Sequence, residues 1–326
     1  MQQAPSGPHL SQSTHTGQLM LQVLFALTPG IAAMTWVFGY GIITNIMLAI
    51  TSAVVMEAAM LAVRKRPIIS TLKDNSAILS AVLLALSIPP LTPWWMIIIG
   101  TLFAIVVAKH LYGGLGFNVF NPAMVGYAIL IISFPLQMTL WPDLQLPRLS
   151  LNESLHWQFN NQLSTANTLD AITSATPLDT LRTATRNNES LVNIKQLTVI
   201  QQHVWILASA WLMGGFWLIY QRIAAWQLPT AFLGSYTVFT GIYWLIDPTQ
   251  QTTPLFYLLH GSVIMAAFFI VTDPVTAPMT PAGRLIAGAL VGILVFVIRS
   301  WGGYPEGVAF AVLLMNLTVP LIDRYL

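Results

Sequence analysis

The chain has 326 residues, of which 56% are hydrophobic and 7% are charged, and its mean hydropathy is +0.70. Soluble domains carry about 25% charged residues, so this composition excludes a soluble globular enzyme and a disordered chain. A net charge of +2 supplies no basic surface for nucleic acid, and the absence of cysteine excludes thiolate chemistry. We therefore expect a multi-span membrane protein in contact with the lipid bilayer.

Ten apolar runs come close to the length of about 20 residues that a membrane-spanning helix needs. They lie at 20–38, 42–62, 76–89, 94–110, 122–136, 204–220, 228–246, 254–272, 284–299 and 306–322. These runs predict an all-α polytopic membrane protein. We expect four parts in chain order: a tail (1–19), a five-helix half (20–136), a long polar loop (137–203) and a second five-helix half (204–326).

Basic residues predict the orientation, because short cytoplasmic loops are rich in Lys and Arg. Four of them share the loop between the second and third runs: Arg64, Lys65, Arg66 and Lys73. If that loop is inside, Lys109 also lies inside, where we interpret it as a positive anchor, and the loop 137–203 lies outside. Both termini are then cytoplasmic, and the protein spans the inner (cytoplasmic) membrane.

Two stretches of the chain are alike. Leu91–Pro93 and Tyr112–Gly114 flank one apolar run, and Met279–Pro281 and Trp301–Gly303 flank another. Five runs separate the two copies, so the copies have opposite orientations in the membrane. We therefore predict two inverted five-helix repeats, as in many transport proteins whose working site lies at the repeat interface. The alternative is that Gly-Gly pairs are simply common in membrane loops.

The outside loop contains the segment Asp170–Pro177, with Asp179 shortly after it. The local sequence predicts the start of a helix, with Thr176 at the N-cap, Pro177 at the first position and an acidic residue at the third. A helix N-terminus also attracts anions, because its first backbone N–H groups have no partner inside the helix. A phosphate esterified to Thr176 would therefore meet free N–H groups.

The same segment resembles the motif read by the ApbE-type flavin transferase, which esterifies FMN through its phosphate to the final Thr. Five residues carry this resemblance: Asp170, Thr173, Ser174, Ala175 and Thr176. Three further segments are similar to signatures of the RnfD/NqrB family of membrane proteins, and they occur in the expected order. These segments are Gly113–Tyr127, Thr272–Pro278 and Gly302–Asn316.

The resemblance, closest to the RnfD members, implies a membrane subunit of an ion-translocating electron transport complex of the ferredoxin:NAD oxidoreductase type (the Rnf complex), which is not catalytic alone. It implies a flavoprotein and phosphoprotein with covalent FMN on Thr176, and it leaves open a second, noncovalent flavin. The implied partners are the other members of the complex and, during maturation, the flavin transferase. Such transferases act outside the cytoplasmic membrane, in agreement with the position that the basic residues predict for 137–203.

Four other polar residues each have a functional and a structural interpretation. Glu57 lies inside the second run. Its carboxylate either belongs to an ion path or extends toward the basic residues of the next loop. Glu306 either lines an ion path or is a charge at a helix N-terminus. Asn118 and Asn121 lie in a Gly-rich break, where they either coordinate a cation or the edge of a flavin, or support a tight re-entrant turn.

Two other functions stay open at this stage. The repeat and the Gly-rich breaks are compatible with a stand-alone secondary transporter, or a channel-like permease without a redox cofactor. A structural membrane scaffold is the third function. The outside loop favours the redox subunit, because a plain transporter has no need of a flavin motif. We predict no catalytic residue and no metal site, since the six histidines show no ligand spacing.

Overall fold

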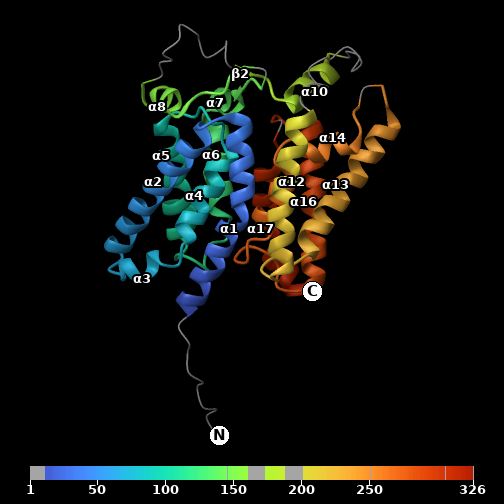
Figure 1. The fold of residues 1–326 in the computed structure, drawn as a ribbon. Coiled ribbons are helices and arrows are strands. Elements are labelled where there is room, and N and C mark those ends of the chain that lie inside the picture. Colours follow the sequence, from blue (N-terminus) through green and yellow to red (C-terminus); the bar gives the residue numbers. More distant parts are fainter. Residues whose placement is uncertain are drawn as a thin grey trace.

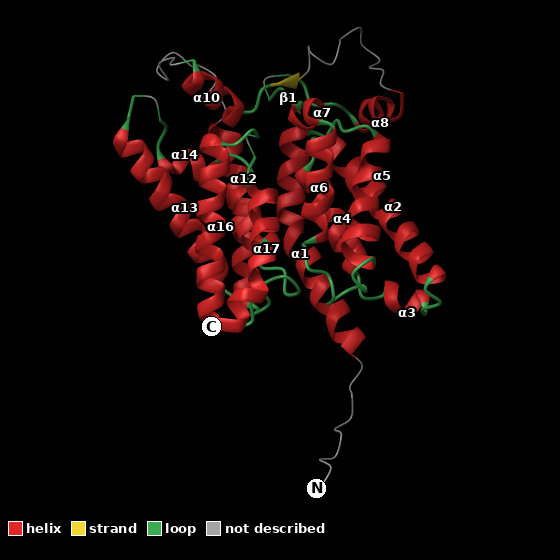
Figure 2. Cartoon of the chain, turned by 180° about the vertical axis from the view of Figure 1, so that it is seen from behind, coloured by secondary structure: helices red, strands yellow, loops and turns green. Residues whose placement is uncertain are grey.

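The computed structural model describes residues 12–144, 146–160, 173–187, 201–249, 251–304 and 306–325. These ranges are mostly helical, as predicted, and the helices stand side by side in a bundle (Figure 1). The first turns of the N-terminal helix, the last turns of the C-terminal helix and α3 (Ile68–Leu72) lie at one end of the bundle. The helices of the long polar segment lie at the opposite end (Figure 2): α7 (Pro135–Thr139), α8 (Leu151–Asn160) and α10 (Pro177–Arg186).

Five of the helices are long and apolar enough to cross a membrane. They are α1 (Gln12–Phe38), α2 (Gly41–Val63), α12 (Gln201–Tyr220), α16 (Pro281–Trp301) and α17 (Val308–Tyr325). Shorter helices cover the other apolar runs of the first half: α4 (Ser76–Ser87), α5 (Trp94–Leu102) with the π-helix η1 (Phe103–His110), and α6 (Pro122–Ser133). In the second half, α13 (Gln227–Ile246) packs along α16. The chain is therefore a multi-pass membrane protein, as its composition predicts.

The first helix begins earlier than the apolar run suggests, because its start packs against the turn that follows α3. Gly17 lies within the predicted tail 1–19, yet it is helical, and its carbonyl accepts a hydrogen bond of 3.3 Å from the Asn75 side chain. A side chain at position 17 would collide with the Lys73 carbonyl. This tertiary contact extends α1 beyond the hydrophobic boundary.

The apolar run 254–272 is not one helix. It consists of α14 (Pro254–Leu259), then α15 (Val263–Met265) and the π-helix η3 (Ala266–Ile270). The break lies at Gly261, whose φ of +76° is a left-handed conformation that glycine adopts without steric cost. A broken helix inside a membrane protein is stable only where other protein groups or water satisfy the freed backbone groups.

Glycines allow α1 and α12 to approach each other closely near the middle of the bundle. The Trp211 ring lies directly over Gly30, and the backbone carbonyl of Ala26 lies directly against Gly214. Small residues at such crossings are typical of membrane helices, where association depends on close packing rather than on the hydrophobic effect. This contact joins the first half of the chain to the second.

We expect Gly214→Ala to destabilise the chain by about 1–3 kcal/mol, because the added methyl group would overlap the Ala26 carbonyl. Gly234 in α13 provides the matched control, since no heavy atom lies within 4 Å of a methyl group added there. Gly234→Ala should leave stability unchanged or raise it by up to about 1 kcal/mol through helix propensity. Unfolding of the purified chain in mixed detergent measures both effects. Equal stabilities would contradict the close crossing.

Candidate functional site

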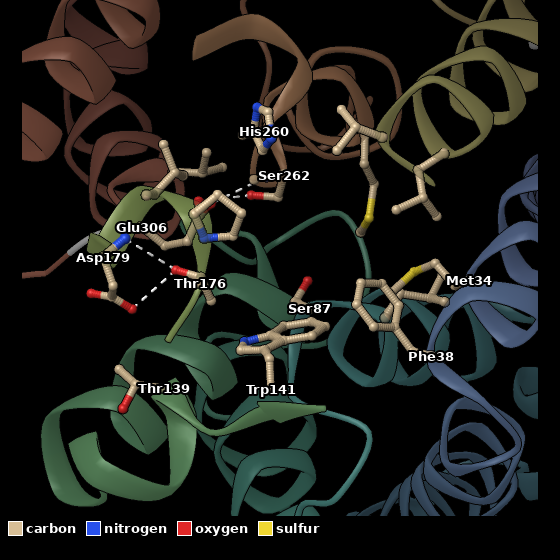
Figure 3. Close-up of a pocket in the computed structure, with 18 of the residues that line it drawn as sticks. Met34, Phe38, Ser87, Thr139, Trp141, Thr176, Asp179, His260, Ser262 and Glu306 are labelled. Carbon is tan, nitrogen blue, oxygen red and sulfur yellow. Dashed lines mark hydrogen bonds between the residues drawn. The ribbon is translucent and has the colours of Figure 1, made fainter. Parts of the chain in front are cut away.

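A cavity of about 240 Å³ lies between the two halves of the chain, below the polar segment (Figure 3). Most of its lining is apolar or aromatic, including Met34 and Phe38 of α1, Trp211 of α12 and Trp141 of β1 (Trp141–Pro142). Such a lining with a few polar groups is typical of sites for small molecules and cofactors.

The predicted motif runs along the edge of this cavity. β2 (Thr173–Ser174) pairs antiparallel with β1, with Ser174 opposite Trp141, which holds the motif against the bundle. Ser174, Ala175 and Thr176 line the cavity, while Thr173 lies in the strand beside it. Asp170 lies outside the described residues. Three consecutive motif residues therefore face one pocket.

Thr176 is the N-cap of α10, which confirms the helix start predicted from the sequence. Its backbone is extended, with φ −65° and ψ 155°, and its Oγ1 accepts a hydrogen bond of 3.2 Å from the Asp179 backbone N–H. The same hydroxyl donates to the Asp179 carboxylate at 3.0 Å. Removal from water raises the pKa of the Asp179 carboxyl, while the Thr176 hydroxyl and the positive charge of Arg182 oppose that rise.

The remainder of α10 anchors this end of the segment to the bundle. Its apolar face is buried through Leu178 and Leu181, and the Arg182 guanidinium donates to the carbonyl of Gly302, just after α16. At the first half, Trp157 of α8 similarly donates to the Leu91 carbonyl at 2.8 Å. The described parts of the polar segment thus form a docked cover for both halves of the chain.

Glu306 lines the same cavity, and it is held in place on two sides. Arg299 donates to both carboxylate oxygens at 2.8 and 2.9 Å, and Ser262 donates through its backbone N–H and its hydroxyl at 3.2 and 3.0 Å. Arg299 also donates to the Tyr236 hydroxyl at 2.8 Å. The carboxylate is therefore bound by an arginine from α16 and a serine from the broken helix.

His260 is a buried residue of the cavity to which the sequence analysis gave no role. It is 6% exposed and lies at the break between α14 and α15. Its Nδ1 lies 2.9 Å from the Phe256 carbonyl, and its ring stacks on the Phe256 ring with centroids 3.8 Å apart. Its Nε2 is buried and has no hydrogen-bond partner in the described part of the chain. The only sequence signal was its position directly before Gly261, within an apolar run.

A second polar cluster lies away from this cavity, around Glu57 in the part of α2 that leads toward α3. The Lys109 ammonium lies 2.7 and 2.8 Å from the two Glu57 oxygens and also donates to the Ser76 hydroxyl at 2.8 Å. His110 Nε2 lies 3.1 Å from Glu57. Glu57 and Lys109 are 1% and 2% exposed.

Two interpretations from the sequence are wrong at this cluster. Glu57 does not reach the basic residues of the next loop, since the Arg64 guanidinium donates to the His110 carbonyl at 3.0 Å instead. Lys109 is not an exposed anchor but the buried partner of Glu57. The physical reason is that a carboxylate removed from water needs an opposite charge nearby, and η1 supplies one from the adjacent helix.

Asn118 and Asn121 belong neither to the lining of the cavity nor to the Glu57 cluster. Asn121 caps α6, where its side chain accepts from the Met124 backbone N–H at 3.2 Å and donates to Asp273 at 3.2 Å. Its backbone N–H donates to the Asn316 side chain at 3.0 Å. The Asn118 side-chain nitrogen donates to the Phe120 carbonyl at 3.1 Å, while its oxygen is buried without a partner among the described residues.

Comparisons with known proteins identify the relationship. The model of the NQR2, RnfD, RnfE family matches residues 3–326. A protein of Shigella dysenteriae serotype 1 (strain Sd197), named as the D subunit of the ion-translocating oxidoreductase complex, is 47% identical over 336 residues, which cover 98% of this chain and 95% of that protein. A protein of the same name from Escherichia coli O139:H28 (strain E24377A / ETEC) is 48% identical over 338 residues, with the same two shares covered. The chain therefore belongs to the NQR2, RnfD, RnfE family.

Proposed function

We propose that this chain is the D-type membrane subunit of an ion-translocating oxidoreductase complex and carries FMN esterified to Thr176. In this role it relays electrons between other members of the complex, coupled to ion transport. The observation that carries the proposal is that the Thr176 hydroxyl, at the N-terminus of α10, lines a largely apolar cavity between the two halves. The names of its relatives support membership of such a complex.

The residues present fit an FMN phosphoester. A phosphate on Thr176 would lie beside the first backbone N–H groups of α10, which favour an anion. The aromatic rings of Phe38, Trp141 and Trp211 offer apolar surface for a flat ring system. The Asp179 carboxylate lies close to the added negative charge, and the nearby Arg182 guanidinium offsets part of the repulsion between them.

The same proposal includes ten membrane-spanning helices arranged as two inverted five-helix repeats. It is supported by the packing of α1 on α12 and of α6 on α17, which are the first and fifth helices of each repeat. Both termini would face the cytoplasm. The flavin-bearing segment would face the periplasm, on the other side of the inner membrane. In support, α3, which lies between basic residues of the sequence, and α10, whose N-cap Thr176 lines the cavity, lie at opposite ends of the bundle (Figure 1).

Two further parts of the proposal concern residues outside the Thr176 motif. Glu57 and Glu306 are proposed as carboxylates of the ion path, because each is a charged group held within the helix bundle by a basic partner. Asn118 is proposed as a contact of a second, noncovalent flavin, because its side-chain oxygen is buried without a partner in the described ranges. Asn121 would shape that site through its cap of α6.

Thr176→Val should abolish covalent FMN, because a phosphoester needs the hydroxyl, while the helix bundle stays intact. Intact-mass measurement and in-gel flavin fluorescence after co-expression with the transferase read the result directly. Loss of the cap alone would cost about 1 kcal/mol of local helix stability and would leave a flavin in place. A stand-alone transporter or scaffold predicts no covalent flavin in the wild type.

The controls for this experiment are neighbouring hydroxyl residues. Thr176→Ser keeps a hydroxyl at the acceptor position and should retain some flavin, whereas Thr180→Val, which lies outside the motif, should retain it fully. A wild-type chain without the FMN mass, or a Thr176→Val chain that still carries it, would refute the assignment.

The Glu57 pair calls for a double variant. Lys109→Met alone leaves a buried, uncompensated carboxylate and should destabilise the chain by about 3–5 kcal/mol. The double variant Glu57→Gln/Lys109→Met removes both charges and should fold and assemble. If Glu57 lies on the ion path, complexes that contain the double variant should lose most of their redox-driven ion uptake in vesicles. Full uptake would mean that Glu57 serves only to neutralise Lys109.

A further inference from the structure

The cavity contains several polar side chains, and nearly all of them are occupied by other protein groups. Glu306 accepts from Arg299 and from Ser262. The Asp179 carboxylate accepts from the Thr176 hydroxyl. His260, which lines the cavity (Figure 3), differs from them, because its Nε2 is buried and no described residue bonds to it. Buried polar atoms in native proteins normally have a partner, so the position of this atom indicates a ligand.

The surroundings of His260 fix which hydrogen bond it can make. Its Nδ1 lies 2.9 Å from the Phe256 carbonyl, which can only accept, so Nδ1 carries the proton. In the neutral imidazole Nε2 is then an acceptor, with its lone pair in the ring plane. Stacking on the Phe256 ring holds that plane in one orientation. A positive charge on His260 is disfavoured, because the residue is buried and the Arg299 guanidinium lies 3.5 Å from its carbonyl.

We propose that Nε2 of His260 accepts a hydrogen bond from the N3–H of the isoalloxazine ring of FMN attached to Thr176. This inference rests on the proposed function and assigns the residue that orients the flavin ring. N3–H is the single N–H donor of the oxidised ring system, and the other polar atoms of its edge are acceptors. An unprotonated imidazole nitrogen is complementary to that donor and to none of those acceptors.

His203 is the other histidine of the cavity, and it makes a suitable control. Its Nδ1 also has no protein partner among the described residues, but its ring is half-buried beside Trp36 at the edge of the bundle. As a residue His203 is more exposed than His260, which is 6% exposed, so His203→Leu tests whether any unpartnered histidine of the cavity has the same effect.

Resonance Raman spectra of the oxidised flavin test the assignment, because one ring band contains N3–H bending and shifts on exchange into D₂O. The full chain is co-expressed with the flavin transferase as wild type, His260→Leu, His260→Gln and His203→Leu. Intact mass should show covalent FMN in all four. The N3–H band should move to lower frequency in His260→Leu, return toward the wild-type position in His260→Gln, which restores an acceptor, and stay unchanged in His203→Leu.

Two outcomes separate this inference from the function beneath it. Chains that carry the FMN mass but show the same N3–H band in wild type and in both His260 variants would overturn the role of His260 alone. A shift in His203→Leu without one in His260→Leu would also overturn it. A wild-type chain with no FMN mass would overturn the proposed function, and the assignment of His260 with it.

Discussion

The placement of charge inside an apolar bundle is the constraint on which this structure depends. A charged group removed from water is costly unless an opposite charge and hydrogen bonds accompany it. The pairs Glu57–Lys109 and Arg299–Glu306 meet this requirement. The first joins two helices that are distant in the sequence, and the second joins residues on either side of the turn that follows α16. Each pair therefore also fixes how its helices pack, since a shift of one helix would separate the charges.

The helix break beside the cavity is subject to a similar constraint, because buried polar groups need hydrogen-bond partners. The break in the run 254–272 exposes backbone and side-chain groups that a continuous helix would satisfy internally. Ser262 binds the Glu306 carboxylate, and Arg299 lies within 3.5 Å of the His260 carbonyl, so the break is stabilised by the neighbouring ion pair. Above it, the pairing of β1 with β2 and the docking of α10 bring the Thr176 motif over the opening. The Thr176 hydroxyl thus lines a largely apolar pocket at the junction of the two halves.

A feature of this structure can be predicted from the sequence when the interaction that forms it joins residues close together in the chain. Thr176 was predicted as an N-cap from its neighbours alone, because capping involves atoms three residues apart. The partner of Lys109 was not predicted, since nothing local tells a lysine that faces the membrane surface from one that turns inward to a carboxylate on another helix. His260 was missed for the same reason, because its importance comes from a cavity that separate parts of the chain enclose.

The sequence by itself determined the fold class, the membrane environment, the family and the helix start at Thr176. These follow from composition, from the lengths of apolar runs and from short motifs, all of which are properties of contiguous residues. Only the tertiary structure decided which buried charges pair, where the apolar run 254–272 breaks, and that the His260 Nε2 is buried without a partner among the described residues. Those features depend on distances between residues far apart in the chain, and a single sequence does not encode such distances in any local pattern.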